Sequence, residues 1–312
     1  MKKVILTGGT GMLGIALIQL LIQKHIEVLV IVRPDSKRKN ALPVSEYVKV
    51  IECDLKDILQ LKEQITDTYD TFFHFAWDGT FGESRNDMRL QNQNVKATLD
   101  AVELAKATGC TTFLGAGSQA EYGRVDGIKL GPDTPVRPET GYGIGKLCAG
   151  QMSRILCQQL GMKHIWVRIL STYGPHDGLH TMVMSGIIKM LNQERPQYTK
   201  GEQMWDYLYC EDAARAFYLA AEQGVDGSVY CIGSGQVRPL ADYITVIRDT
   251  VDPDIEIGFG EIPYYDKQVM YLCADIENLT RDTGFKPEIS FEEGVRRTVD
   301  WYKEEMKHEK NN

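Results

Sequence analysis

The sequence predicts an α/β protein built on a doubly wound parallel β-sheet. Two observations support this prediction. Short runs rich in β-branched residues alternate with segments whose apolar residues recur at helical spacing, which is the pattern of repeated βαβ units. The first of these runs leads directly into a glycine-rich turn and an amphipathic segment. A length of 312 residues, with 43% hydrophobic and 25% charged residues, suits one large α/β domain or two smaller ones.

About seven strands are expected. They are the runs at residues 3–8, 27–32, 48–53, 71–76, 111–117, 164–170 and 229–233. Helices are expected between them, including long ones around 92–108 and 141–160, where apolar residues recur at helical spacing. The last third of the chain has more aromatic residues, prolines and irregular spacing, and it ends in a polar, weakly helical tail after Tyr302. We therefore expect a smaller, loop-rich α/β lobe at the C-terminal end.

Composition argues against several other classes of protein. The net charge is -8 with both signs mixed along the chain, so there is no basic stripe that would favour nucleic acid or anionic lipid. The most apolar early stretch, at 15–32, is interrupted by polar and charged residues and has no window long enough to span a membrane. The N-terminal residues resemble no signal peptide. These observations predict a cytoplasmic protein without nucleic-acid or membrane partners.

The cysteines predict neither a disulfide framework nor a metal site. There are seven of them, they are scattered along the chain, and no two are spaced as C-x-x-C. Both zinc sites and disulfide-rich frameworks show more regular cysteine patterns. Reduced and mostly buried cysteines are therefore expected, and no metal is predicted.

The segment TGGTGMLG, at residues 7–14, ends the first predicted strand and begins the first predicted helix. Glycines there permit a tight turn and the close approach of a pyrophosphate to the helix N-terminus. The segment predicts a Rossmann-type dinucleotide-binding domain over 1–170, with contributions from about 207–235, and a mainly substrate-binding lobe over 171–312. A turn without a ligand, or one that serves a methyltransferase, is the alternative. The expected cofactor contacts are Gly8, Thr10, Gly11, Met12, Leu13 and Gly14.

The end of the second strand favours NADP over NAD. Val32 stands where an acidic residue would bond the ribose 2′-hydroxyl of NAD, and Arg33 follows it. An arginine can pair with the 2′-phosphate of NADP, and Ser36 and Arg38 are nearby. The alternatives are that Arg33 only caps a solvated loop and that the cofactor is NAD. Asp54, after the third strand, is placed to bond the adenine amino group, although a surface turn could also use an aspartate there.

A serine and a Tyr-x-x-x-Lys pair predict acid–base chemistry. Tyr142 and Lys146 are four residues apart, so on a helix their side chains share one face. A neighbouring ammonium, with a nicotinamide cation close by, is expected to lower the pKa of the Tyr142 phenol toward neutrality. Ser118, at the end of the fifth strand, would then hold a substrate carbonyl or hydroxyl oxygen. A structural tyrosine beside a solvated lysine is the alternative.

Together these motifs resemble the extended short-chain dehydrogenase/reductase superfamily of nucleotide-sugar epimerases, dehydratases and reductases, over essentially the whole chain. The matching motifs are TGGTGMLG, HFA at 74–76, the helix motif at Asn94, GSQAEYG and YGIGK, followed by RILSTYGP, YLYCEDAARAF and TGFKPEISFEEG. The resemblance implies that Ser118, Tyr142 and Lys146 are catalytic and that Asn94 stabilises the neighbouring strand. It also implies cofactor contacts at Leu55, Phe75, Ala76, Tyr142 and Lys146.

The residues after Ser118 argue against a dehydratase. The 4,6-dehydratases of this superfamily carry an acidic pair there, whereas this chain has Gln119 and Ala120. Glu121 is expected to point to the other side of the strand end. A reductase that uses NADPH on a 4-keto sugar and an NAD-dependent 4-epimerase remain. Arg33 favours the reductase, and so does the C-terminal half, which resembles CDP-abequose and CDP-paratose synthase-like 4-ketoreductases.

The expected substrate site departs from the superfamily pattern. Members that bind nucleotide diphosphate sugars usually clamp the pyrophosphate with two arginines, and Trp205 and Tyr265 stand at those positions here. Aromatic residues supply stacking surfaces rather than bidentate anion contacts. Either another cation takes over the phosphate, or the substrate is not a nucleotide diphosphate sugar. The candidate cations are Lys200, Arg238 and Lys267, and the expected substrate contacts are Trp77, Ser118, Gln119, His180, Trp205, Arg238 and Tyr265.

Two further expectations follow from the resemblance. The segment at 173–180 is similar to GDP-fucose synthase, which implies a second acid/base histidine at His180 or His176. The long helices imply a homodimer, in which Met152 and Ile155 belong either to the interface or to the core. The predicted function is therefore reduction or epimerisation of a nucleotide sugar. A non-catalytic NADP-binding redox sensor is the contrasting class, and it would have no use for a proton-donating tyrosine.

Overall fold

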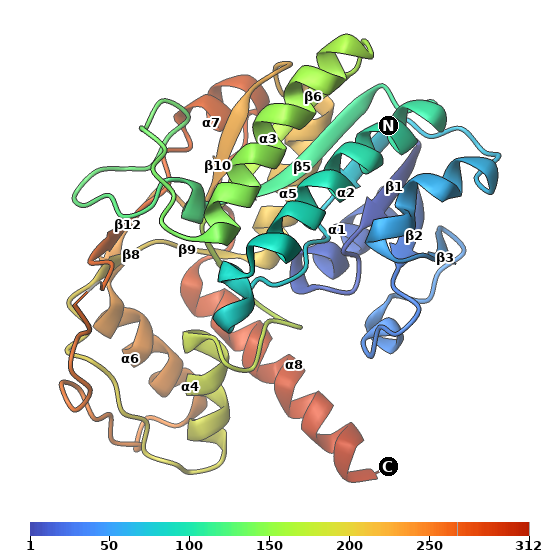
Figure 1. Ribbon diagram of the computed structural model, residues 1–312. Coiled ribbons are helices and arrows are strands. Elements are labelled where there is room, and N and C mark those ends of the chain that lie inside the picture. Colours follow the sequence, from blue (N-terminus) through green and yellow to red (C-terminus); the bar gives the residue numbers. More distant parts are fainter. Residues whose placement is uncertain (267, 312) are drawn as a thin grey trace.

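Seven parallel strands form the central sheet, as predicted (Figure 1). The computed structural model describes residues 1–266 and 268–311, and for 308–311 it describes the backbone only. Lys267, a candidate phosphate contact, therefore lies outside the described residues. The strand order is β10-β6-β5-β4-β1-β2-β3. The strands are β1 (Lys3–Thr7), β2 (Glu27–Val32), β3 (Val48–Glu52), β4 (Thr71–His74), β5 (Thr112–Ser118), β6 (Lys163–Ile169) and β10 (Val229–Ile232).

The direction in which the sheet grows reverses at β1. From β1 the chain adds β2 and β3 on one side, and it then crosses over to add β4, β5 and β6 on the other, with β10 at the far edge. In open parallel sheets, ligands bind beyond the carboxyl ends of the strands at such a reversal. The glycine-rich turn after β1 and the HFA segment at the end of β4 both lie at this point.

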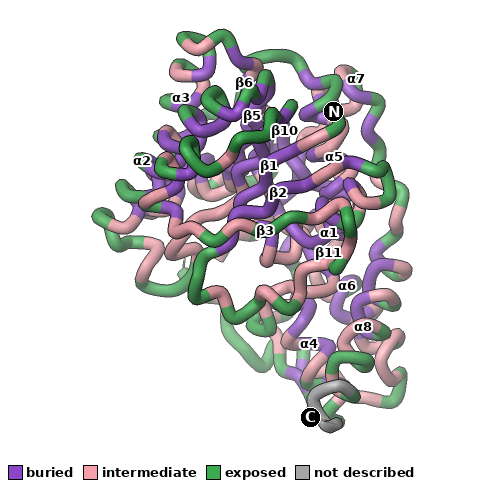
Figure 2. Tube along the Cα trace, turned by 90° about the vertical axis from the view of Figure 1, so that its right-hand side faces the viewer, coloured by how far each residue is buried: buried purple, intermediate pink, exposed green. Residues whose placement is uncertain are grey.

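Helices cover both faces of the sheet. On one face α1 packs against α5, and on the other α2 packs against α3 and the 3-10 segment η2. Alternate residues of each strand serve the two faces: Val4 and Leu6 of β1 pack on the α1 side, and Ile5 packs on the α2 side. Buried residues in Figure 2 accordingly follow the strands. These helical elements are α1 (Met12–Gln23), η2 (Leu55–Glu63), α2 (Met88–Ala107), α3 (Gly141–Gln159) and α5 (Cys210–Gln223).

The second half of the chain also builds a smaller lobe beside the sheet, with a three-stranded sheet of order β11-β8-β12 and the parallel pair β7-β9. The tail expected to be weakly helical after Tyr302 is the continuation of α8, a helix that runs to Asn311. The remaining elements are β7 (Ser171–Tyr173), α4 (Met182–Leu191), β8 (Met204–Trp205), β9 (Tyr207–Tyr209), β11 (Arg238–Pro239), α6 (Leu240–Val251), β12 (Tyr271–Leu272), α7 (Glu277–Thr283) and α8 (Phe291–Asn311).

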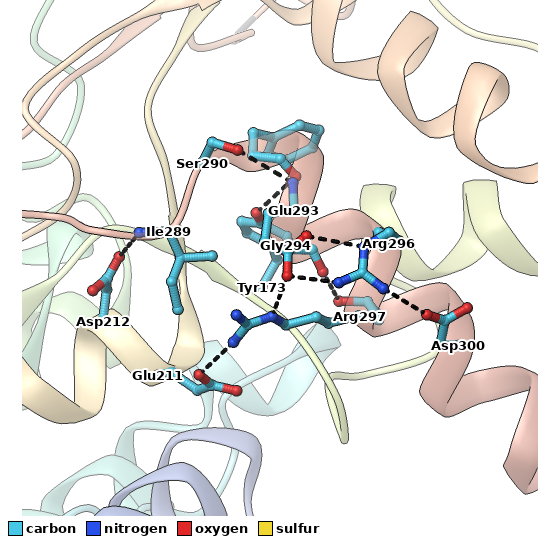
Figure 3. A network of polar contacts seen from close by, with 12 residues as sticks. Tyr173, Glu211, Asp212, Ile289, Ser290, Glu293, Gly294, Arg296, Arg297 and Asp300 are labelled. Carbon is cyan, nitrogen blue, oxygen red and sulfur yellow. Dashed lines mark hydrogen bonds and ion pairs between the residues drawn. The ribbon is translucent and has the colours of Figure 1, made fainter.

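A network of charges joins α8 and the segment before it to α5 (Figure 3). Asp212 of α5 is fully buried, pairs with Arg215 at 2.6 Å and accepts the backbone N–H of Ile289 at 2.8 Å. Arg297 of α8 pairs with Glu211 of α5 at 2.8 Å. Removing one partner of a buried ion pair typically costs about 3–5 kcal/mol. Asp212 is therefore a structural link between the large sheet and the lobe.

The structure also bears on the expectations for the cysteines and for membrane-spanning segments. All seven cysteines are free thiols, and five of them are buried, as predicted. In the part of the chain that the structure describes, no helix combines the length and the apolar character needed to cross a membrane.

Candidate active site

The turn between β1 and α1 fits the pyrophosphate of a dinucleotide. Gly8 has a φ of +77°, which lies in the region that favours glycine. A Cβ at Gly14 would lie 2.7 Å from Cα of Gly9 and would overlap the carbonyl oxygen of Gly8. The turn and the first residues of α1 therefore approach each other too closely for a side chain at either position. The N-terminus of α1 is left facing the carboxyl end of the sheet, where an anion would be stabilised.

A cavity of about 230 Å³ adjoins this turn at the point where the sheet reverses. Seven of the thirteen predicted cofactor contacts line it, together with one predicted substrate contact, Trp77, whereas Gly14, Tyr142 and Lys146 do not. Asp54 is not among its lining residues, because the Asp54 carboxylate caps η2 by accepting the backbone N–H of Lys56 at 3.1 Å. Met12 and Leu13 are also absent from the lining and pack against the core. The lining residues are Thr7, Gly8, Gly9, Thr10, Gly11, Ile31, Val32, Arg33, Ser36, Cys53, Leu55, Phe75, Ala76, Trp77 and Asp78.

Arg33 and Asp78 both line this cavity and form an ion pair. Nη1 of Arg33 lies 3.2 Å from a carboxylate oxygen of Asp78, and Arg33 remains half exposed. The backbone of Asp78 is held by Asn94, which accepts its N–H at 3.0 Å and donates to its carbonyl at 2.8 Å. Asn94 therefore fixes the segment that follows β4, in line with its expected structural role. The contribution of Asp78 was missed from the sequence because nothing in the chain marks it as a partner of Arg33.

The histidine of the HFA segment is a buried structural residue. Nδ1 of His74 accepts from the Thr7 hydroxyl at 2.9 Å, and Nε2 donates to the Thr98 hydroxyl at 3.2 Å, because Thr98 itself donates to the carbonyl of Asn94. Burial lowers the pKa of His74 to about 3, and the Lys146 ammonium acts in the same direction. A neutral His74 therefore links β1, β4 and α2 beneath the cavity.

The three predicted catalytic residues lie close to one another. Ser118 ends β5, and Tyr142 and Lys146 lie in the first turns of α3, which is capped by the Thr140 hydroxyl. Nζ of Lys146 lies 5.9 Å from the centre of the Tyr142 ring and donates to the carbonyl of Ala116 at 2.6 Å. Ser118 is near enough to the Tyr142 phenol for its hydroxyl to lower the phenol pKa. The sequence spacing therefore brings these three side chains together across two elements.

Trp77 joins this group to the cofactor cavity. Nζ of Lys146 lies 4.0 Å above the Trp77 ring, and that ring meets the Tyr142 ring edge-on with centres 6.2 Å apart. The indole N–H donates to the side chain of Gln91 at 2.8 Å, which fixes the orientation of the ring. Trp77 was predicted as a substrate contact, and the structure places it between the cofactor cavity and the acid–base residues.

The expected pKa shift of Tyr142 is corrected by the structure. Burial raises the pKa of the Tyr142 phenol, and the Ser118 hydrogen bond and the Arg85 guanidinium only partly oppose this rise. Burial also lowers the pKa of Lys146 to about 7, although the carboxylate of Glu121 acts in the opposite direction. Desolvation in the interior therefore outweighs the groups around Tyr142 that favour the phenolate.

Arg85 is a residue of this site that the sequence did not reveal. Its guanidinium lies 4.5 Å from the centre of the Tyr142 ring, and Nη1 donates to the carbonyl of Thr80 at 3.0 Å. Arg85 belongs to the short 3-10 segment η3 (Gly82–Asn86), 57 positions before Tyr142. No local motif indicates which helix a loop arginine will contact, so only the folded chain identifies it.

Glu121 supports the serine loop from the interior of the protein. Its side chain is fully buried beneath the end of β5 and pairs with Arg168 of β6 at 2.7 Å. It also completes a capping box, in which it accepts the backbone N–H of Ser118 at 2.9 Å. The neighbouring Gln119, a predicted substrate contact, is half-buried and begins the same short turn. Glu121 therefore lies on the Gly117 face of β5, opposite to the Ser118 side chain as expected, and supports the backbone of the serine loop.

The predicted substrate contacts in the lobe are only partly gathered. Antiparallel pairing of β11 with β8 places Arg238 directly opposite Trp205, whose indole N–H donates to the Ser171 hydroxyl at 2.8 Å. Arg238 pairs with Glu292 at 2.7 Å and lines a cavity of about 530 Å³ that Tyr207, Tyr243 and Phe291 also line. Tyr265 is 62% exposed and does not line this cavity.

The two candidate histidines lie on the segment between β7 and α4. His180 is exposed and meets the Phe81 ring edge-on, with ring centres 4.4 Å apart. His176 packs against Trp301 of α8, and its backbone carbonyl accepts from Arg38 at 2.6 Å. Arg38, expected near the cofactor phosphate, therefore connects the loop after β2 to the lobe.

Comparison with known proteins identifies relatives of this chain. The pattern described as NAD dependent epimerase/dehydratase family matches residues 4–233. A trifunctional UDP-glucose 4,6-dehydratase/UDP-4-keto-6-deoxy-D-glucose 3,5-epimerase/UDP-4-keto-L-rhamnose-reductase of Arabidopsis thaliana is 26% identical over 325 residues, covering 97% of this chain and 47% of that protein. The chain thus spans about half the length of that relative.

Two further relatives match along nearly their whole length. A putative UDP-glucose 4-epimerase of Methanocaldococcus jannaschii is 25% identical, and the match covers 96% of this chain and 98% of that protein. The solved UDP-N-acetylglucosamine 4-epimerase from Methanobrevibacter ruminantium M1, in complex with UDP-N-acetylmuramic acid, is also 25% identical. It superposes with a TM-score of 0.88 over 98% of this chain and 99% of that chain. The similarity therefore includes the lobe as well as the large sheet.

Proposed function

The chain belongs to the NAD-dependent epimerase/dehydratase family, and on that premise we propose that it reduces the 4-keto group of a nucleotide-activated sugar with NADPH. The observation that supports this proposal best is the meeting of Ser118, Tyr142 and Lys146 beside the cofactor cavity, without an acidic residue at Gln119 or Ala120. Ketone reduction needs one proton donor, whereas elimination of water needs an additional acid and base. The site has a proton donor in Tyr142, but it lacks the acidic residues that usually serve as acid and base in the elimination of water.

The residues that would hold the cofactor are those of the cavity beside the turn. The backbone N–H groups at the start of α1 would face its pyrophosphate, and Arg33 would face a 2′-phosphate. Pairing of Arg33 with Asp78 would have to loosen in favour of that phosphate, and Ser36 lines the same part of the cavity. Hydride for the reduction would come from the bound cofactor.

The protein's own part in the reaction is proton transfer and positioning. The hydroxyls of Ser118 and Tyr142 would bind the substrate carbonyl oxygen, and the Tyr142 phenol would donate the proton. A phenol whose pKa is raised by burial stays protonated at neutral pH and is therefore suited to the role of acid. Lys146 would bond the nicotinamide ribose and add positive charge beside the phenol as the proton leaves.

The nucleotide end of the substrate would lie toward the lobe. Trp205 offers an aromatic face where the superfamily usually has an arginine, and Arg238 stands opposite it on the neighbouring strand. Stacking on Trp205 with an anion contact from Arg238 would replace a bidentate arginine clamp. Because Arg238 already pairs with Glu292, we expect weaker binding of the diphosphate than an unpaired arginine would give.

An NAD-dependent 4-epimerase is the second candidate. It is favoured by the names of two relatives, which are 4-epimerases from Methanocaldococcus jannaschii and Methanobrevibacter ruminantium. An epimerase oxidises and re-reduces the same carbon, so it consumes no net cofactor, whereas the reductase consumes one NADPH per product.

A panel of 4-keto nucleotide sugars tests the proposal directly. The purified protein is mixed with each sugar and with NADPH or NADH, and the loss of reduced-cofactor absorbance is followed, with the Tyr142→Phe variant as the control. Stoichiometric oxidation of NADPH by one of the sugars supports the reductase. Interconversion of unmodified UDP-hexoses without net cofactor use would replace it with the epimerase. A protein that binds NADPH but turns over neither class would be a redox sensor.

We also propose that the protein is a homodimer held by α2 and α3. On α3, Ile144, Met152 and Ile155 are 44–52% exposed, and Met88 of α2 is 58% exposed. Leu156, in contrast, packs against the core behind α2. Replacing both Met152 and Ile155 with glutamate should give a monomer in sedimentation experiments, whereas a wild-type monomer would refute the proposal.

A further inference from the structure

A buried ion pair lies directly beneath the catalytic serine. Oε2 of Glu121 is 2.7 Å from Nε of Arg168, and the two side chains are 0% and 4% exposed. The Arg168 guanidinium also lies 4.6 Å from the centre of the Tyr122 ring, and its Nη1 atom has no hydrogen-bond partner among the described residues. A charged pair without contact with water is costly to bury, so its position beside reactive groups calls for a reason.

The second carboxylate oxygen of Glu121 holds the serine loop. Oε1 accepts the backbone N–H of Ser118 at 2.9 Å and the indole N–H of Trp166 at 3.0 Å. The Ser118 hydroxyl in turn accepts the N–H of Ala120 at 3.2 Å. The capping box therefore fixes both the backbone and the side chain of Ser118, the residue proposed to bind the substrate oxygen.

Three glycines leave room for this arrangement. A Cβ at Gly117 would overlap both Oε1 of Glu121 and Nε1 of Trp166, and a Cβ at Gly115 would overlap the Trp166 ring. A Cβ at Gly150 of α3 would lie 2.6 Å from Cε2 of the same ring. Strand β5 and helix α3 thus lack side chains at the places where Trp166 passes between them to reach Glu121.

The charge of Glu121 acts on both acid–base residues of α3. Its carboxylate raises the pKa of Lys146, against the larger lowering by burial. It also adds to the rise in the pKa of Tyr142 that burial causes. Tyr142 is also faced by the Ser118 hydroxyl and by the Arg85 guanidinium of η3, both of which lower its pKa. The Lys146 ammonium lies 5.9 Å from the centre of the Tyr142 ring.

The other groups around this cluster are accounted for as well. Lys146 is faced from β4 by His74, whose pKa is lowered to about 3 by burial and by Lys146 itself. Glu121 is faced by Arg168 of β6 and, from β10, by Cys231, whose pKa burial raises to about 12. His74 and Cys231 are therefore neutral near pH 7, and Arg168 and Glu121 carry the opposite charges of the pair.

We propose that Glu121, paired with Arg168, is a positioning residue that fixes the Ser118 loop from below and places a buried negative charge near Lys146 and Tyr142. This proposal rests on the proposed reductase function. In this role Glu121 connects the packing of β5 on β6 with the chemistry at Tyr142. A carboxylate that served packing alone would affect stability without moving any titration in the active site.

The test compares Glu121→Gln with Asp212→Asn. Both substitutions remove a fully buried carboxylate that pairs with an arginine, but Asp212 lies on α5 in the network of Figure 3, away from Tyr142. Both variants should lose stability. In Glu121→Gln alone, the alkaline limb of kcat/KM for ketone reduction should move to lower pH by about one unit, because loss of a nearby negative charge lowers the pKa of both Tyr142 and Lys146.

A second readout does not depend on turnover. The ionisation of Tyr142 is followed by the ultraviolet absorbance of the phenolate, as the difference between each protein and its Tyr142→Phe derivative. In Glu121→Gln the phenol should titrate at lower pH than in the wild type, and in Asp212→Asn at the same pH. If the wild type reduces no sugar while the phenol still shifts, the reductase function fails and the role of Glu121 in tuning the phenol stands.

Unchanged titration and an unchanged pH profile in a folded Glu121→Gln protein would overturn the proposal. If that variant does not fold, the double variant Glu121→Gln/Arg168→Met, which removes both charges, is used in its place. Its pH profile should also move to lower pH, but by less than in Glu121→Gln. Glu121→Asp provides the rescue. It keeps the charge but draws it back from Ser118, so its pH profile should match the wild type while kcat falls. A profile in Glu121→Asp that shifts as far as in Glu121→Gln would also overturn the proposal.

Discussion

The cofactor turn and the acid–base cluster lie on the same edge of the sheet but are built in different ways. The turn uses consecutive residues, 7–14, and its function depends on backbone N–H groups and on two places where a Cβ would not fit. The acid–base cluster takes side chains from β5, β6, α3 and η3, and its properties depend on buried charges. Local geometry therefore shapes the proposed cofactor turn, whereas tertiary electrostatics sets the charges of the proposed acid–base cluster.

The largest effect is expected for a substitution that impairs the acid–base cluster and leaves the cofactor turn intact. Replacing Tyr142 with phenylalanine removes the proton donor and leaves the turn untouched. We expect kcat to fall by about a thousandfold, within the range for loss of a general acid, while the Kd for NADPH changes by less than about threefold. Stopped-flow turnover and fluorescence titration measure the two values. Parallel losses in both would show that the regions are not independent.

The opposite result is expected for a substitution in the glycine-rich turn, which should weaken cofactor binding and leave the acid–base cluster intact. In Gly14→Ala the added Cβ would lie 2.7 Å from Cα of Gly9, so the turn must open and its N–H groups lose their alignment. We expect the Kd for NADPH to rise by about a hundredfold, equivalent to about 3 kcal/mol. The Tyr142 phenol should titrate as in the wild type. A variant that binds NADPH normally would contradict the role given to the turn.

A smaller effect is expected for the choice of cofactor. Arg33→Ser removes the cation at the end of β2, so we expect the preference for NADPH over NADH to fall by about tenfold, the amount of one exposed charge-assisted contact. Arg124→Ser is the matched control, because Arg124 is similarly exposed, pairs with Glu139 and does not line the cofactor cavity. Steady-state kinetics with both cofactors gives the ratio, and an unchanged ratio in Arg33→Ser would favour NAD.

The last prediction concerns the pH dependence of stability, where the effect over any one pH unit is modest. Burial lowers the pKa of Lys146 to about 7 from an ordinary value of 10.5. Between these values the unfolded chain holds a proton that the folded protein has lost, so this group makes the protein more stable as pH rises through that window. The unfolding constant should change by at most about tenfold per pH unit on this account. Urea unfolding of the wild type should show this rise, and Lys146→Met should lack it.

Much of the arrangement could be predicted because it repeats at short range. All seven strands were located within a few residues, since β-branched runs and alternating faces are properties of neighbouring residues. Ser118, Tyr142 and Lys146 come together as expected, because a strand end and a four-residue helical spacing fix their directions. The parallel direction of the seven strands follows from the repeated βαβ pattern, whereas their order was not predicted.

The parts that could not be predicted depend on contacts between distant segments. Glu121 and Arg168 are 47 positions apart, and nothing local to either residue indicates a buried pair. Arg85 approaches Tyr142 only because η3 packs beside the start of α3. The direction of the Tyr142 pKa shift was wrong for the same reason, since the extent of burial is not a property of the Tyr-x-x-x-Lys motif.

The sequence by itself determined the parallel sheet, the glycine turn and the spacing that brings Ser118, Tyr142 and Lys146 together, because hydrophobic periodicity and backbone sterics act over a few residues. Only the tertiary structure decided how those residues are charged and held. Desolvation and ion pairing depend on which side chains from β5, β6, α3 and η3 exclude water together, and that is known only once the chain has folded.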